Sequence, residues 1–377
     1  MILQEFILLA GGGVDNLSLP RNIHRKDFKL LTFWLELLQG VIDAYSKVKG
    51  LKVTLHFILS PSLVCRTRPL EDGSVAILVP LGLPVRIRIL ARILLGYFGQ
   101  ESITRFANSL LDDIPESDWR IAPSLIPVFG EFVDESAHWR QLGILDSQLE
   151  LNPEIEPAVY DLLWVALCYL TCHEFAHAIR GHFSVVEQIR SNSQTIQKLG
   201  GENNLRKALE IDADAVATSL MLLITREKME AEGVAGDASS AFFWIGYAFT
   251  LIFGLYDSRR KALNLYSKAF YPHPIVRHAL ILDFAELAFA QNDPAMEKSW
   301  TETSIKGWHE CVSALRHLDV DVFMGKFGTA RNNEELAKFV PVTAMNYTIF
   351  DTSYVKDQVR NARALTESVL NQVGLGS

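Results

Sequence analysis

The segment His173-Glu174-Phe175-Ala176-His177 constrains this 377-residue chain more than any other. Side chains four residues apart lie on the same face of a helix, so a helix here brings the imidazoles of His173 and His177 together. Glu174 lies one step further around that helix. The arrangement HExxH typically binds zinc, and its glutamate then acts as a general base. The segment therefore predicts a helix that carries part of a metal site.

A third metal ligand is expected from the segment LEIDADAVA, residues 209–217. Glu210 and Asp214 share one face of the expected helix, and alanines on another stripe allow a neighbouring helix to approach closely. Two histidines and Glu210 would give three protein ligands and leave a fourth position for water, the pattern of a catalytic zinc. Asp214 is expected to accept the other ring N–H of a ligand histidine. An acidic, solvated helix face is the alternative interpretation.

The two motifs together resemble those of the Glu-zincin metallopeptidases of the HtpX and CAAX-prenyl-protease type. Their pattern is HExxHxxxGH followed by ExxAD, and this chain has HEFAHAIRGH from His173 and EIDAD from Glu210. The resemblance covers roughly residues 160–280. Soluble phage-exclusion peptidases of the Lit type, which also carry HExxH, are a second group that the first motif resembles.

The resemblance implies a zincin-like catalytic core of packed helices. It also implies a set of site residues: zinc bound by His173, His177 and Glu210, with Glu174 as the catalytic base. The metzincin pattern fits less well, because it requires a histidine where this chain has Phe183. We expect the neighbouring His182 to be a packing or hydrogen-bonding residue.

A later segment, YPHPIVR from Tyr271, looks like the family's His-Pro…Arg element. The histidine and arginine of that element are thought to face the active site. His273 and Arg277 are therefore expected to help stabilise the oxyanion of a tetrahedral intermediate. The alternative is a proline-bounded turn with a capping histidine and a surface arginine.

The rest of the chain predicts an α+β fold that is mainly helical, with a small sheet supplied by its N-terminal part. Val53–Leu59 and Ser74–Val79 are the expected strands, and Glu71–Gly73 is a turn signal between them. Apolar periodicity and helix start signals predict helices at 27–49, 85–99, 158–182 and 351–373, and from 279 to 318 with a break at 292–294. Residues 121–139 are expected to be irregular. We expect an N-terminal α/β region, 1–150, and a helical zinc-peptidase domain, 151–377.

Composition restricts the partners and the compartment. Hydrophobic residues make up 49% of the chain, enough for a sizeable core. The net charge of −8 argues against nucleic acid, whose binding proteins carry a basic stripe. The four cysteines show no CxxC spacing, which predicts reduced thiols in the cytoplasm. The basic side chains of Arg86, Arg88 and Arg92 are expected to be solvated, with their stems along apolar surface.

One stretch, Ala238–Tyr256, has 19 residues without a charge and a basic flank, which are features of a membrane span. A single span here would put Glu210 and His273 on opposite sides of the membrane. A buried or re-entrant helix is therefore expected, and inner-membrane association through this stretch is not favoured.

The sequence thus predicts a zinc-dependent metalloendopeptidase that acts on a protein or peptide substrate. The same zinc site would also serve acyl or amidase chemistry on a non-peptide amide. Two further alternatives stay open. One is a triggered bacterial defence or toxin-type peptidase with a single host protein as substrate. The other is a non-catalytic protein whose zinc only joins two helices.

Overall fold

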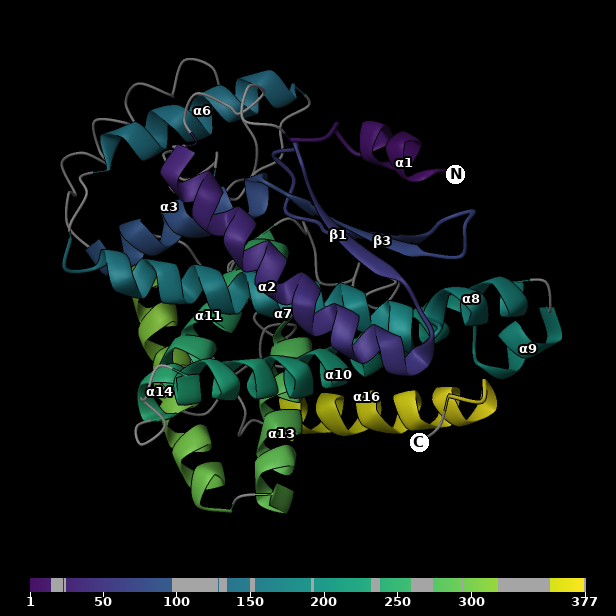
Figure 1. The fold of residues 1–377 in the computed structure, drawn as a ribbon. Helices are drawn as coiled ribbons and strands as arrows, with labels where there is room; N and C mark the ends of the chain where they lie inside the picture. The colour runs from purple at the N-terminus through teal and green to yellow at the C-terminus, as the bar shows by residue number, and fades with distance from the viewer. Residues whose placement is uncertain are drawn as a thin grey trace, which may run out of the picture. The chain divides into compact units, whose positions relative to one another are not determined.

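The computed structural model describes residues 1–14, 23, 25–96, 128, 134–149, 153–190, 193–231, 238–258, 274–292, 294–317 and 353–375. These residues are mostly helical and include a three-stranded sheet, which confirms the α+β, mainly helical prediction (Figure 1). The chain divides into two compact units, one made largely of Met1–Ile179 and the other largely of Arg180–Ser313 and the C-terminal residues. The predicted division into an N-terminal α/β region, 1–150, and a helical zinc-peptidase domain, 151–377, stays a prediction.

The sheet of the first unit has the strand order β1-β3-β2, and its strands are β1 (Val53–Ile58), β2 (Arg66–Pro69) and β3 (Val75–Pro80). β1 and β3 run parallel, whereas β2 and β3 are antiparallel. The central strand β3 is buried along its whole length, as expected for an apolar strand with neighbours on both sides.

The two predicted strands are confirmed as neighbours, and the turn at Glu71–Gly73 is confirmed as well. That turn leads from β2 into β3. Gly73 has a φ of +79°, a conformation that a side chain would disfavour. β2 was not predicted, because its sequence RTRP has no apolar alternation and ends in a proline. Proline is tolerated on an edge strand such as β2.

The helices of the first unit are α1 (Leu3–Leu9), α2 (Arg25–Lys49), α3 (Gly82–Gly96), α6 (Glu135–Gln148) and α7 (Glu156–Ile179). α7 packs against α3, α2 and the strands β2 and β3. α6 includes residues 135–139, so the prediction of irregular structure there was wrong. α7 ends three residues before the predicted end at His182, because Gly181 has a φ of +68° and cannot continue a right-handed helix.

α7 is buried on nearly every side. Within the described residues it is the one helix long and apolar enough to cross a membrane, yet 83% of its most apolar window lies inside the protein. A core helix gives the same signal, so this is weak evidence for a membrane. The predicted membrane candidate forms helix α11 (Ala238–Ser258), whose apolar stretch, Ala241–Tyr256, is shorter than a membrane span requires.

The arginines of α3 are buried, which corrects the prediction that they are solvated. Arg88 is paired with Asp27 and Asp146, and Arg92 with Asp146 and Glu156. Arg86 donates to the carbonyl oxygens of Pro61 and Val128. Buried charges of this kind are tolerated when they are paired with an opposite charge or hydrogen bonded, as these three are.

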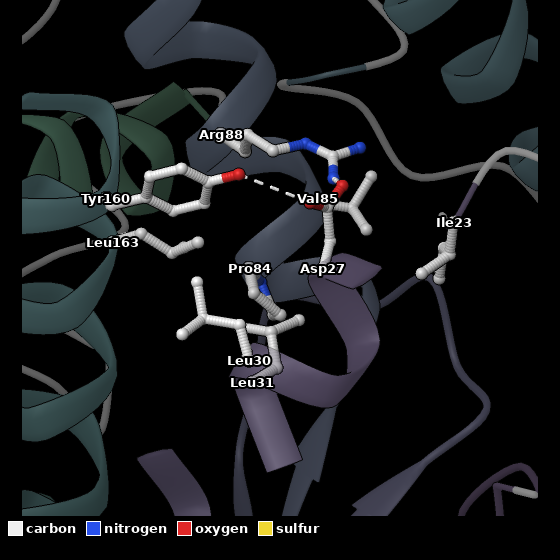
Figure 2. Close-up of a pocket in the computed structure, with 9 residues that line it drawn as sticks. All are labelled: Ile23, Asp27, Leu30, Leu31, Pro84, Val85, Arg88, Tyr160 and Leu163. Carbon is white, nitrogen blue, oxygen red and sulfur yellow. Dashed lines mark hydrogen bonds and ion pairs between the residues drawn. The ribbon is translucent and has the colours of Figure 1, made fainter. Parts of the chain in front are cut away.

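A small cavity borders this charged cluster (Figure 2). Figure 2 shows the Tyr160 hydroxyl pointing at Asp27, with which it is hydrogen bonded at 3.2 Å. The cavity has a volume of about 10 Å³, which is room for roughly one water. It is therefore too small to receive a substrate.

The second unit is helical, with α8 (His182–Arg190), α9 (Ser193–Lys198), α10 (Glu202–Ala231), α11, α13 (Pro274–Asn292), α14 (Pro294–His317) and α16 (Ser353–Gln372). α10 packs along α16 and α13 (Figure 1). The predicted break at 292–294 and the predicted C-terminal helix are confirmed. An apolar cluster joins α8, α10 and α16 through Val185, Ile189, Leu205, Leu209, Val369 and Leu370.

Candidate metal centre

The two histidines of HExxH lie in the last two turns of α7. Their Nε2 atoms are 3.2 Å apart. A tetrahedral zinc with bonds of 2.0–2.1 Å to two nitrogens would hold them roughly 3.3 Å apart. His173 is buried and His177 is partly exposed. The pair is thus spaced as two ligands of one ion would be.

Glu210 of α10 completes a group of three possible ligands. Each residue offers one ligand atom, and the three atoms lie within 4.8 Å of one another, so His173, His177 and Glu210 could hold a metal ion. Two imidazole nitrogens and one carboxylate oxygen are a donor set that suits zinc among the common divalent metals. The residues therefore fit the metal that the sequence predicts.

Glu174 receives a hydrogen bond from strand β2. The Thr67 hydroxyl donates to its Oε2 atom, so a side chain 107 residues away in the sequence holds one carboxylate oxygen of the expected base. Glu174 itself is partly exposed. Thr67 was not predicted, because β2 was not predicted, and a single threonine gives no sequence signal of its own.

Arg277 and Asp214 form a buried pair. Nε and Nη2 of Arg277 each donate to a different oxygen of Asp214 at 2.7 Å. The side chain of Asp214 is fully buried, and Nη1 of Arg277 lies 3.8 Å from Oε2 of Glu210. Arg277 thus places a positive charge beside the third candidate ligand, and Asp214 holds Arg277 there.

These contacts bear on two predicted roles. Asp214 was expected to bind a ligand histidine, and Arg277 was expected to stabilise an oxyanion. In the structure they bind each other. His273, the partner expected for Arg277, lies outside the described residues. The roles of all three in a reaction stay predictions.

Asp212 is a further charged residue of α10 that the sequence did not single out. Its carboxylate accepts hydrogen bonds from Arg180 at 2.8 and 3.2 Å, and Nε2 of His182 lies 2.9 Å from its Oδ2. Burial raises the pKa of Asp212, but the hydrogen bonds from His182 and Arg180 outweigh burial, and the net pKa is below its ordinary value. His182 is therefore a hydrogen-bonding residue, as expected.

All four cysteines are buried and free of disulfides. Burial raises the pKa of the Cys65 thiol, and the negative charge of Glu174 raises it further. A hydrogen bond to Cys172 and burial raise the pKa of Cys168. Metal ligation requires a thiolate, so these two thiols are poor candidates for ligands.

No family model, curated protein or solved structure matches this chain, so the resemblance to Glu-zincin peptidases depends on the two motifs and on the contacts described above.

Proposed function

We propose that this chain is a zinc-dependent metalloendopeptidase. The observation that carries the proposal is the convergence of His173, His177 and Glu210, whose ligand atoms lie within 4.8 Å of one another, with Glu174 next to His173 on the same helix. Three protein ligands leave a position for water, which is characteristic of catalytic rather than structural zinc sites.

Zinc at such a site supplies a water of lowered pKa and polarises the carbonyl that is attacked. Glu174 takes the proton of the attacking water and later delivers it to the leaving amine. Thr67 donates a hydrogen bond to one of its carboxylate oxygens and so orients the group that transfers the proton. Arg277, anchored on Asp214, keeps its charge next to Glu210.

Strand β2 supports a peptide as the substrate. β2 lies at the edge of the sheet, and its Thr67 reaches Glu174. An extended peptide can add to a sheet edge through main-chain hydrogen bonds. At the opposite edge, the Gln39 side chain bonds to β1 by donating to the Val53 carbonyl at 2.8 Å and accepting from the Leu55 amide at 2.7 Å. Within the part of the chain that the structure describes, no strand pairs with the outer edge of β2, so the edge beside the expected base is the one suited to an added strand.

The experiment compares wild type with Glu174→Gln, both purified with zinc supplied. We expect about one zinc per chain in both by elemental analysis, because Glu174 is not a ligand in this proposal. Each protein is then incubated with a proteome-derived peptide mixture, and new termini are counted by mass spectrometry. Wild type should create termini that Glu174→Gln does not.

A matched control is Glu187→Gln, the same chemical change at an exposed position of α8. It should behave as wild type does. Zinc binding without any termini that depend on Glu174 would overturn the peptidase proposal and favour a zinc that only joins helices. Termini that persist in Glu174→Gln would remove Glu174 as the base.

A further inference from the structure

The short segment that follows the HExxH helix is fixed by one carboxylate. Arg180 and His182, separated only by Gly181, both bind Asp212 of α10. Gly181 has a φ of +68°, and this turn starts a new helix at His182. A residue with a side chain would be strained there. The turn at Gly181 and the two residues beside it are thus held together by hydrogen bonds to Asp212.

Arg180 also connects this turn to the residues that follow helix α16. Nη2 of Arg180 also donates to the Leu375 carbonyl oxygen at 2.7 Å. Leu375 follows helix α16, which packs along α10, and it joins the apolar cluster of α8, α10 and α16. One guanidinium group therefore bonds to α10 and to the C-terminal tail.

The hydrogen bonds to Asp212 are shielded from water. The side chain of Asp212 is 10% exposed and that of His182 is 2% exposed. Hydrogen bonds to a charged group are stronger when little water competes for them, and a buried carboxylate that loses its donors is destabilising. Asp212 therefore holds the segment 180–182 in one position relative to α10.

The positions of these residues in the sequence connect them to the metal ligands. Asp212 lies two residues after Glu210 on α10, and Arg180 lies three residues after His177. A contact between Arg180 and Asp212 restricts the chain just beyond His177 and the helix that carries Glu210 at the same time.

We propose that Asp212 is a positioning residue for the metal centre: through Arg180 and His182 it holds the chain that follows His177 against the helix that carries Glu210, so that the ligands are in place before the metal binds. The inference depends on the proposed zinc site. Removing a residue that binds a metal ligand directly lowers metal affinity about 10- to 100-fold; Asp212 acts one contact further from the metal, so a loss near the lower end is expected.

The test measures metal binding by the full-length protein, so it needs no substrate. Zinc affinity is obtained by competition with a chelator, and the absorption spectrum of the Co²⁺-substituted protein reports the coordination geometry. Asp212→Asn should bind zinc about 10-fold more weakly than wild type and should change the Co²⁺ spectrum. Arg180→Gln, at a side chain that is 30% exposed, should weaken binding in the same direction and keeps the test possible if Asp212→Asn does not fold.

The matched control is Glu202→Gln. Glu202 forms an exposed ion pair with Arg190 that also joins α10 to α8, so this variant removes a contact between the same helices away from Asp212. Its zinc affinity and Co²⁺ spectrum should equal those of wild type. A loss of affinity as large as that of Asp212→Asn would show a general effect of helix contacts and overturn the inference.

Two failures are distinguishable. A folded Asp212→Asn or Arg180→Gln protein with wild-type zinc affinity and Co²⁺ spectrum overturns the positioning role alone, while wild type still binds zinc. A wild-type protein that binds neither zinc nor Co²⁺ overturns the proposed function and this inference together.

Discussion

At the scale of single residues, the buried pair of Arg277 and Asp214 allows a direct prediction about stability. Arg277→Met removes two charge-assisted hydrogen bonds from a fully buried carboxylate. Breaking a buried pair on one side costs about 3–5 kcal/mol. We expect a loss of that size in the free energy of unfolding, measured by urea denaturation of the metal-free protein.

The control for this prediction is Arg190→Met, which breaks an exposed pair and should cost less than about 1 kcal/mol. The double variant Arg277→Met/Asp214→Leu should recover much of the loss, because it removes the buried charge as well. Equal stabilities of Arg277→Met and Arg190→Met would contradict the role assigned to the buried pair.

Buried arginines also show which contacts could not be predicted from the sequence. Arg88 and Arg92 were expected in water, yet their partners are carboxylates 54 to 64 residues away. A helical pattern gives the position of a charge on its own helix but not the charge that another helix places against it. His173 and His177 could be predicted as a pair because spacing within one helix brings them together, whereas Glu210 was predicted from a second motif on another helix.

At the scale of elements, the contact between β2 and α7 leads to a kinetic prediction. Thr67→Val keeps the shape of the side chain but cannot donate to Glu174. A hydrogen bond to a charged group contributes about 1.5–3 kcal/mol, so kcat should fall by roughly tenfold or more. It is measured on a peptide that wild type cleaves, together with zinc content, which should not change.

Thr67→Ser retains the hydroxyl and should restore most of kcat. If Thr67→Val raised KM and left kcat unchanged, Thr67 would contact the substrate rather than hold the base. If both variants lost zinc, the contact would support the fold of α7 and not the chemistry.

Helices were more predictable than strands at this scale. α2, α13, α14 and α16 follow from apolar periodicity and proline signals, which are local. β2 is stabilised by pairing with β3, a contact that its own four residues do not encode. Thr67, which donates to Glu174, was not predicted for this reason. The sheet edge formed by β2, which supports a peptide as the substrate, was not predicted either.

At the scale of the whole molecule, the burial of His278 leads to a prediction of how the free energy of unfolding depends on pH. It is packed among the rings of Phe249, Phe253 and Trp308, and burial lowers its pKa to about 3. The unfolded chain binds a proton near pH 6.5, whereas the folded protein does not until about pH 3. The contribution of neutral His278 to the free energy of unfolding is therefore fully present above pH 6.5 and is lost progressively as the pH falls toward 3.

His278→Leu removes this linkage at nearly constant volume. Between pH 6.5 and 4.5, wild type should lose on the order of 2–3 kcal/mol more than the variant, because each pKa unit corresponds to about 1.4 kcal/mol. The measurement is urea unfolding at a series of pH values. Parallel pH profiles of wild type and His278→Leu would show that His278 is not the group responsible.

The metal should also contribute to the stability of the whole molecule. A ligand that binds only the folded protein stabilises it by mass action, and His173, His177 and Glu210 converge only when α7 and α10 are folded. Chelation with EDTA should therefore lower the thermal unfolding midpoint of wild type. Glu174→Gln should show the same decrease, because it keeps all three ligands. Glu210→Ala should start from a lower midpoint and respond little to EDTA. A midpoint that chelation leaves unchanged in zinc-loaded wild type would mean that the three side chains do not hold a metal that the fold depends on.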